Sequence, residues 1–125
     1  FIKIPKIGAF NVHLGKLPEY RGALSSFWVL RFGDKVAGAT LHRVVPEIDA
    51  GEIITEVRLP VQTKSMEKLM HSTVCEASQM VVDGMEKIIS DDLSPVETGE
   101  RQTNYFLMPT YRDFSAFYKY GCRLI

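Results

Sequence analysis

A run of apolar residues with helical spacing constrains the fold of this 125-residue chain more than any other feature. Between Ser65 and Ser90, apolar residues recur every three or four positions, which places their side chains on one face of an α-helix. The Ser65 side chain can cap the first turn, and Glu67 complements the positive end of the helix. The segment therefore predicts one long amphipathic helix. Its apolar positions are Met66, Leu69, Met70, Val74, Ala77, Val81, Met85, Ile88 and Ile89.

Two shorter elements are predicted near the start of the chain. Residues 9–13 alternate apolar and polar side chains, which indicates the end of a strand with Phe10 and Val12 facing the core. Residues 24–32 are a short helix candidate. Gly33 is well placed to end that helix, because glycine readily adopts the left-handed conformation found at helix C-termini.

Two strands are predicted between the short helix and the long one. Residues 36–45 are rich in β-branched side chains, and residues 53–61 alternate with period two. These strands would flank a turn at residues 46–51. The order strand, helix, strand, strand, helix predicts an α/β fold with a mixed, mostly parallel sheet and flanking helices.

The remaining sequence predicts a loop and a second, shorter helix. Residues 90–102 are polar and contain Pro and Gly, as is typical of a loop. Thr110 and Asp113 have the spacing of a helix capping box, and Gly121 is expected to end that helix. The length fits a single domain or a fragment of one. We divide it into a strand-helix-strand-strand region (1–61), a long helix (65–90), a loop (91–103) and a C-terminal aromatic helix and tail (104–125).

Charge and composition argue against several classes of function. Fifteen basic and fifteen acidic residues give a formal net charge of zero, so no overall attraction to nucleic acid or to an anionic membrane is expected. No apolar run is long enough to span a bilayer. Cys75 and Cys122 have neither metal-site nor disulfide-framework spacing, which favours a reducing, cytoplasmic location.

Candidate chemical groups occur where the first strand ends and in the later turn. Asn11 and His13 lie two positions apart, so on a strand their side chains share one face. Taken alone, this pair also fits an amide that satisfies backbone groups beside a partly exposed histidine. Asp49 lies in an Asp-x-Gly sequence, which in isolation is a turn signal.

In combination, these motifs resemble the formyltransferase fold family, which includes glycinamide ribonucleotide transformylase, methionyl-tRNA formyltransferase, sugar N-formyltransferases and formyltetrahydrofolate hydrolase. The resemblance runs from about Lys6 to Val61 and implies that region 1–61 is catalytic. It also implies that the chain is the C-terminal portion of a Rossmann-like domain, whose N-terminal half it lacks. The motifs are Asn11-x-His13, Leu17-Pro18-x-Tyr20-Arg21-Gly22, Gly38-x-Thr40-x-His42 and Asp49-Ala50-Gly51.

The resemblance assigns the active site to Asn11, His13 and Asp49. An amide N–H from Asn11 and a protonated His13 would stabilise the oxyanion that forms when an amine attacks a formyl carbon. Histidine is also the natural proton shuttle near neutral pH. Asp49 would favour the imidazolium and orient the ring or a water.

The resemblance also implies a formyl donor, 10-formyltetrahydrofolate, and no metal. The pterin of the donor would lie against the turn formed by Val45, Pro46, Glu47 and Ile48. Lys16 and Arg21 are candidates for binding an anionic group of the acceptor, and two solvated loop cations are the alternative. Leu14, Gly15 and Lys16 depart from the Pro-Ser or Gly-Ser that usually follows the family's histidine.

The acceptor and the completeness of the chain stay open at this point. A small amine, such as an amino sugar or glycinamide ribonucleotide, is expected, because the segment after Gln102 is too short for a tRNA-holding domain. A hydrolase with the same triad and water as acceptor, or a non-catalytic fragment that binds a partner, are the alternatives. An open sheet edge would associate with the absent N-terminal half or with a second copy. His42 is interpreted as a packed or rim histidine, and the aromatic residues of 105–120 as packing or as an acceptor pocket.

Overall fold

The computed structural model describes residues 5–125 and contains two sheets. Strands β1 (Phe10–His13), β3 (Val36–Arg43) and β4 (Ile53–Pro60) form a three-stranded sheet in the order β1-β3-β4. Strands β2 (Arg21–Gly22) and β5 (Tyr105–Phe106) form a separate pair. The predicted strands are therefore present, and two short ones are added.

The three-stranded sheet is antiparallel throughout, which corrects the expectation of a mostly parallel sheet. β1 pairs with β3 in a register that places His13 opposite Thr40, and β3 pairs with β4 with Ala39 opposite Val57. The connection between β3 and β4 is a short turn, whereas parallel neighbours need a longer crossover. Among the strands of the described residues, only β2 and β5 pair in parallel, and an isolated parallel bridge joins Ser65 to Arg123.

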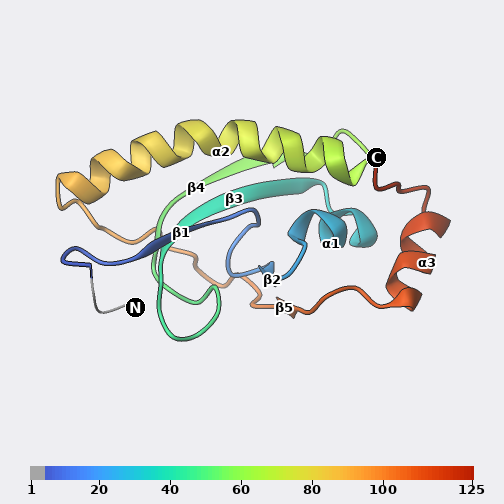
Figure 1. Cartoon of the computed structure of the whole chain (residues 1–125), viewed down its shortest axis with the longest axis horizontal. Coiled ribbons are helices and arrows are strands. Elements are labelled where there is room, and N and C mark those ends of the chain that lie inside the picture. The colour runs from blue at the N-terminus through green and yellow to red at the C-terminus, as the bar shows by residue number, and fades with distance from the viewer. Residues whose placement is uncertain (1–4) are drawn as a thin grey trace.

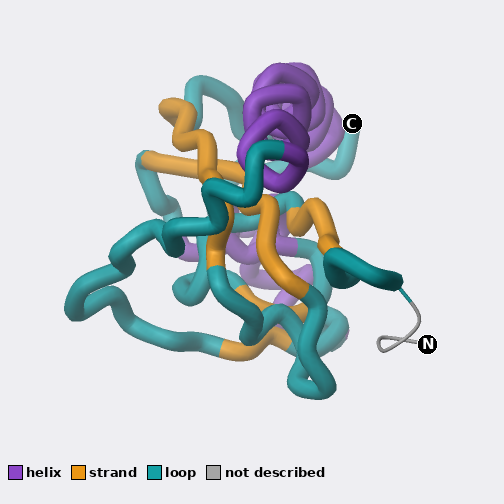
Figure 2. The backbone as a smooth tube through the Cα atoms, turned by 90° about the vertical axis from the view of Figure 1, so that its left-hand side faces the viewer, coloured by secondary structure: helices purple, strands orange, loops and turns teal. Residues whose placement is uncertain are grey.

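The predicted long helix is confirmed as α2 (Met66–Ile89), which runs along the sheet (Figure 1). The Ser65 side chain caps it by accepting a hydrogen bond from Lys68 N at 3.2 Å. Figure 2 shows the helix nearly end-on, on one side of the strands. Gly84 permits close contact with the sheet, because a Cβ there would lie only 2.3 Å from Leu41 Cδ2.

The two shorter helices pack together beside the N-terminal end of α2. The helix α1 (Ser25–Phe32) ends at Gly33 as predicted, with φ +70°. The helix α3 (Tyr111–Lys119) has the predicted capping box of Thr110 and Asp113. Phe27 and Phe117 are fully buried and stack at 4.6 Å, which joins these helices into one core.

β1 lies at the edge of its sheet among the described residues, and this position corrects one predicted core residue. Phe10 packs against the cluster under α2, but Val12 is 37% exposed. Val12 lies opposite Leu41 and borders a cavity with Met66 and Met70, so α2 covers it only in part. An edge strand has a neighbour on one side only, which explains the exposure.

The sheet face opposite α2 is polar and is covered by the segment that follows β1. The Thr40 hydroxyl donates to Gly15 O at 2.8 Å and accepts from Leu17 N at 3.3 Å. Glu56, opposite Thr40, accepts two hydrogen bonds from Arg101 of the loop after α2. These contacts fix the segment 14–20 over the sheet. Within residues 5–125, no helix is long and apolar enough to cross a membrane, and no side-chain cluster could hold a metal ion.

Candidate active site

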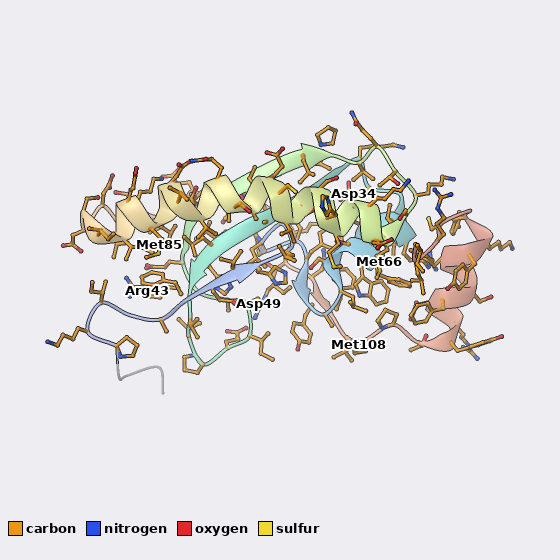
Figure 3. All side chains as sticks on the ribbon, turned by 45° about the horizontal axis from the view of Figure 1, so that its top comes forward. Asp34, Arg43, Asp49, Met66, Met85 and Met108 are labelled. Atoms are coloured by element: carbon orange, nitrogen blue, oxygen red, sulfur yellow. The ribbon has the colours of Figure 1, made fainter. Side chains whose placement is uncertain are left out.

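The end of β1 and the turn after β3 bring a histidine and an aspartate together. His13 is the last residue of β1, and Asp49 belongs to the turn between β3 and β4. His13 Nδ1 lies 3.6 Å from Asp49 Oδ2, and the two side chains are 10% and 12% exposed. Figure 3 shows Asp49 beside β1. The predicted proximity of these two residues is therefore present.

The other ring nitrogen of His13 faces a backbone carbonyl. His13 Nε2 lies 2.6 Å from Tyr20 O and 3.2 Å from Ser25 Oγ. A carbonyl oxygen only accepts, so Nε2 carries the hydrogen in this arrangement. The imidazolium has one N–H for the Tyr20 carbonyl and one directed at the Asp49 carboxylate. Both N–H groups of an imidazolium at this position therefore have an acceptor nearby.

Gly15 makes this packing around His13 feasible. A Cβ at residue 15 would lie 2.6 Å from His13 Nε2 and 2.5 Å from Ser25 Oγ, which is closer than real Cβ atoms approach. The departure from the family pattern at residues 14–16 therefore has a local reason, because a side chain at residue 15 would displace His13 or Ser25. Ser25 was not among the residues singled out from the sequence, since a serine at a helix start is ordinarily a cap.

Backbone contacts fix the carboxylate of Asp49. Asp49 has a positive φ of 48°, a conformation that Asp tolerates better than most residues. Gly22 N donates to Asp49 Oδ2 at 2.9 Å, which ties the turn to the segment after β1. Asp49 Oδ1 lies 3.6 Å from His42 Nε2. One carboxylate thus lies between two histidines.

His42 is buried at 3% exposure and links Asn11 to this group. Burial lowers the pKa of His42, as does the neighbouring His13, although the Arg43 carbonyl and Asp49 act in the opposite direction. The neutral ring donates from Nδ1 to Arg43 O at 3.0 Å, which leaves Nε2 to accept from Asn11 Nδ2 at 3.2 Å. The interpretation of His42 as a packed histidine is correct for its burial but misses these two polar neighbours.

The structure therefore brings His13, His42 and Asp49 together, and Asn11 joins them through His42. Asn11 lies on the same face of β1 as His13 and is exposed. In the sequence, the motif Gly38-x-Thr40-x-His42 is the one signal that relates His42 to Asn11, His13 and Asp49. The contact depends on the pairing of Asn11 with His42 across β1 and β3.

The predicted donor turn borders a cavity of about 380 Å³. The cavity is bounded by the turn 44–49 on one side and by Asn11 and His42 on the other. Arg21 holds the turn in place. Its Nε and Nη2 donate to Ile48 O at 3.0 and 2.6 Å, and Nη2 also contacts Glu47 Oε1 at 2.8 Å. Arg21 is thus already engaged by the turn.

Lys16 is placed elsewhere, on the polar face of the sheet. It is 7% exposed, and its ammonium donates to Asp34 Oδ2 at 2.9 Å. Tyr20 OH donates to the same oxygen at 3.1 Å. Burial alone would raise the pKa of Asp34, but Lys16 and Tyr20 lower it overall, so the carboxylate is charged. In this position Lys16 neutralises Asp34 and contacts neither His13 nor Asp49.

Comparison with known proteins identifies similarity to one enzyme family. The family model described as formyl transferase matches residues 1–85. The bifunctional polymyxin resistance protein ArnA of Wigglesworthia glossinidia brevipalpis is 33% identical over 106 residues, which is 84% of this chain and 16% of that protein.

Solved structures show the same fold. The phosphoribosylglycinamide formyltransferase of Anaplasma phagocytophilum is 29% identical, with a TM-score of 0.66 over 81% of this chain and 52% of that one. An N-formyltransferase from Helicobacter canadensis, in complex with folinic acid and dTDP-3-aminofucose, is 21% identical, with a TM-score of 0.74 over 93% of this chain and 50% of that one. The chain thus spans about half the length of each of these solved relatives and 16% of the ArnA protein.

Proposed function

Because the chain belongs to the formyl transferase family, whose model matches residues 1–85 of the 125, we propose that its protein transfers a formyl group from 10-formyltetrahydrofolate to the amine of a small acceptor. One observation carries the assignment of residues. The His13 ring lies between the Asp49 carboxylate and the Tyr20 carbonyl, with Asn11 on the same face of its strand. These residues all belong to region 1–61. The long helix (65–90) and the C-terminal region (104–125) support that region by packing.

His13 has the contacts of a proton carrier in this reaction. When an amine attacks the formyl carbon, a C–N bond forms, negative charge develops on the formyl oxygen, and the amine must lose a proton. The bond from the formyl carbon to the folate nitrogen then breaks, and that nitrogen takes up a proton. His13 can carry the proton between the two nitrogens, while the nearby Asp49 carboxylate stabilises the imidazolium.

Asn11 is suited to stabilise the developing charge on the formyl oxygen. One N–H of its amide is directed to His42, which fixes the orientation of the side chain. The second N–H stays available for an oxygen in the cavity that Asn11 borders. A donor that is fixed before the reaction begins needs no reorganisation when charge appears.

The turn 45–48 is proposed as the donor site. It borders the same cavity as Asn11, His42 and Asp49, so a formyl group there would lie between the turn and these three residues. His13 does not line this cavity and would act from beside Asp49. The complex of the Helicobacter canadensis enzyme with folinic acid supports a folate donor. No metal is assigned a role.

The acceptor is proposed to be an amino sugar or glycinamide ribonucleotide. The solved relatives include an enzyme in complex with dTDP-3-aminofucose and a phosphoribosylglycinamide formyltransferase. Lys16 contacts the Asp34 carboxylate, and Arg21 contacts the Ile48 carbonyl and the Glu47 side chain. An anionic acceptor would have to compete with these contacts. We therefore expect the acceptor's amine, rather than its phosphate, to approach this part of the site.

The test is the replacement of His13 by Ala in the full-length protein. Loss of general acid–base catalysis is expected to lower kcat by about 10²–10⁴-fold, with much less effect on folate binding. Turnover is measured with candidate amines and, separately, without any amine. A formylated amine as product supports transfer, whereas formate alone identifies a hydrolase. Wild-type kcat in His13→Ala would remove His13 from the chemistry.

A further inference from the structure

A cavity of about 660 Å³ lies away from the candidate active site. It is bounded by the C-terminal end of α1, by residues 61–64 after β4, and by Tyr120 after α3. It shares no lining residue with the cavities that Asp49 borders. Asp34, which lines it, and Asp49 lie in separate parts of the molecule (Figure 3). Its volume is in the range of ligand-binding pockets, roughly 300–1,000 Å³.

Positive charge dominates the lining of this cavity. Arg31, Lys35 and Lys64 line it, and among the described residues none of the three lies within 4.0 Å of a carboxylate oxygen. The single acidic residue in the lining, Asp34, is neutralised by Lys16. The carboxylate of Asp113 on α3 interacts electrostatically with Arg31, but Asp113 does not line the cavity. The cavity therefore presents three cations with little compensating negative charge.

Two of these cations are held in place before any ligand binds. The Arg31 guanidinium lies 5.8 Å from the Phe32 ring centre and 5.5 Å from that of Tyr120. Lys64 Nζ donates to Tyr120 O at 2.9 Å. Arg31 Nε is buried and has no hydrogen-bond partner among the described residues, although buried donors are nearly always paired.

We propose that this cavity binds the phosphate group of a small phosphorylated molecule. Arg31 and Lys64 would contact the phosphate oxygens directly, and Lys35 would add positive charge. A dianion matches this lining better than a single carboxylate does, because three cations converge on one space. The exposed rings of Phe32 and Tyr120 would contact the organic part of the ligand. This site is independent of the formyl transfer proposed above.

The test is a calorimetric titration of the full chain with AMP, inorganic phosphate and adenosine. AMP is expected to bind and adenosine is not. The titration with inorganic phosphate shows whether the free ion binds as well, or whether the site requires a phosphate ester. Arg31→Gln and Lys64→Gln should each weaken AMP binding by roughly tenfold or more, as expected for lost hydrogen bonds to a charged group. Arg112→Gln and Lys68→Gln, which remove the same charge from exposed helix positions, should leave the affinity unchanged.

Circular dichroism establishes that each variant is folded, and Lys64 is exposed enough for its replacement to leave the core intact. Three results would overturn the proposal. These are the absence of binding by both phosphate and AMP, binding that is indifferent to Arg31→Gln and Lys64→Gln, and binding that is instead lost in Arg21→Gln beside the candidate active site.

Discussion

Gly15→Ala is expected to disturb the candidate active site, because no room exists for a methyl group beside His13. A Cβ at residue 15 would lie 2.6 Å from His13 Nε2 and 2.9 Å from Ser25 Cβ. Favourable contacts between heavy atoms are about 3.5–4.0 Å long, so His13 or the start of α1 must move by about 1 Å. The φ of Gly15 is not in the left-handed region, so the effect is steric. A displacement of this size costs about 10²-fold in kcat, and overpacking costs about 1–3 kcal/mol of stability.

The assay compares kcat for formyl transfer with the free energy of unfolding in urea, both in the full-length protein. Gly84→Ala is the matched control. A Cβ at residue 84 would lie 2.3 Å from Leu41 Cδ2, on the sheet face that α2 covers, whereas the contact of His13 with the Tyr20 carbonyl lies on the opposite face. The control should lose stability through overpacking but keep its kcat. Its loss is offset in part, because Ala stabilises a helix by roughly 1 kcal/mol relative to Gly. If Gly15→Ala loses stability as Gly84→Ala does but keeps wild-type kcat, the start of α1 takes up the displacement, and the reasoning that a methyl group at residue 15 displaces His13 is refuted.

Three further predictions concern charged groups. Asp49→Asn should lower kcat, because the charge that supports an imidazolium is lost, and a wild-type pH–rate profile would leave Asp49 as a turn residue only. Because burial holds the pKa of His42 below 6.5, the unfolded chain binds a proton at that residue before the native chain does, so stability should fall as the pH drops below 6.5. His42→Asn should flatten this part of a urea-denaturation pH series. Arg101→Ala should cost about 1–2 kcal/mol, because it leaves the partly buried Glu56 with one fewer cation, and a urea midpoint equal to wild type would contradict this.

The local parts of the fold could be predicted from the sequence because their signals are local. The period of the apolar residues specifies α2, and Ser65 and the pair of Thr110 and Asp113 mark helix starts through contacts within one turn. The direction of the strands is different. A helix between β1 and β3 suggests a parallel crossover, yet the two strands pair antiparallel. The alternation of side chains along a strand is the same for either direction, so that pattern does not specify the choice.

The candidate site divides in the same way. The resemblance pointed to His13 and Asp49, and their separation of 3.6 Å agrees with it. The engagement of Lys16 by Asp34 could not be predicted, because the two residues meet only after the segment 14–20 folds over the sheet. The contact of Arg21 with the Ile48 carbonyl is likewise tertiary, and binding of an acceptor anion by Arg21 stays a prediction. Long cationic side chains reach many partners, so their roles depend on tertiary contacts.

The two histidines at Asp49 illustrate how surroundings can assign different tasks to one residue type. A single carboxylate can support one neighbouring imidazolium, and two adjacent imidazolium ions would repel each other. The arrangement resolves this conflict through the second ring nitrogen. His42 uses Nδ1 on a carbonyl and offers Nε2 as an acceptor to Asn11, which requires the neutral ring that its burial favours. His13 has an acceptor near each ring nitrogen, Tyr20 O at Nε2 and Asp49 Oδ2 at Nδ1, so both N–H groups of an imidazolium at this position would have partners. In the proposed reaction, His42 would therefore orient Asn11, and His13 would move the proton.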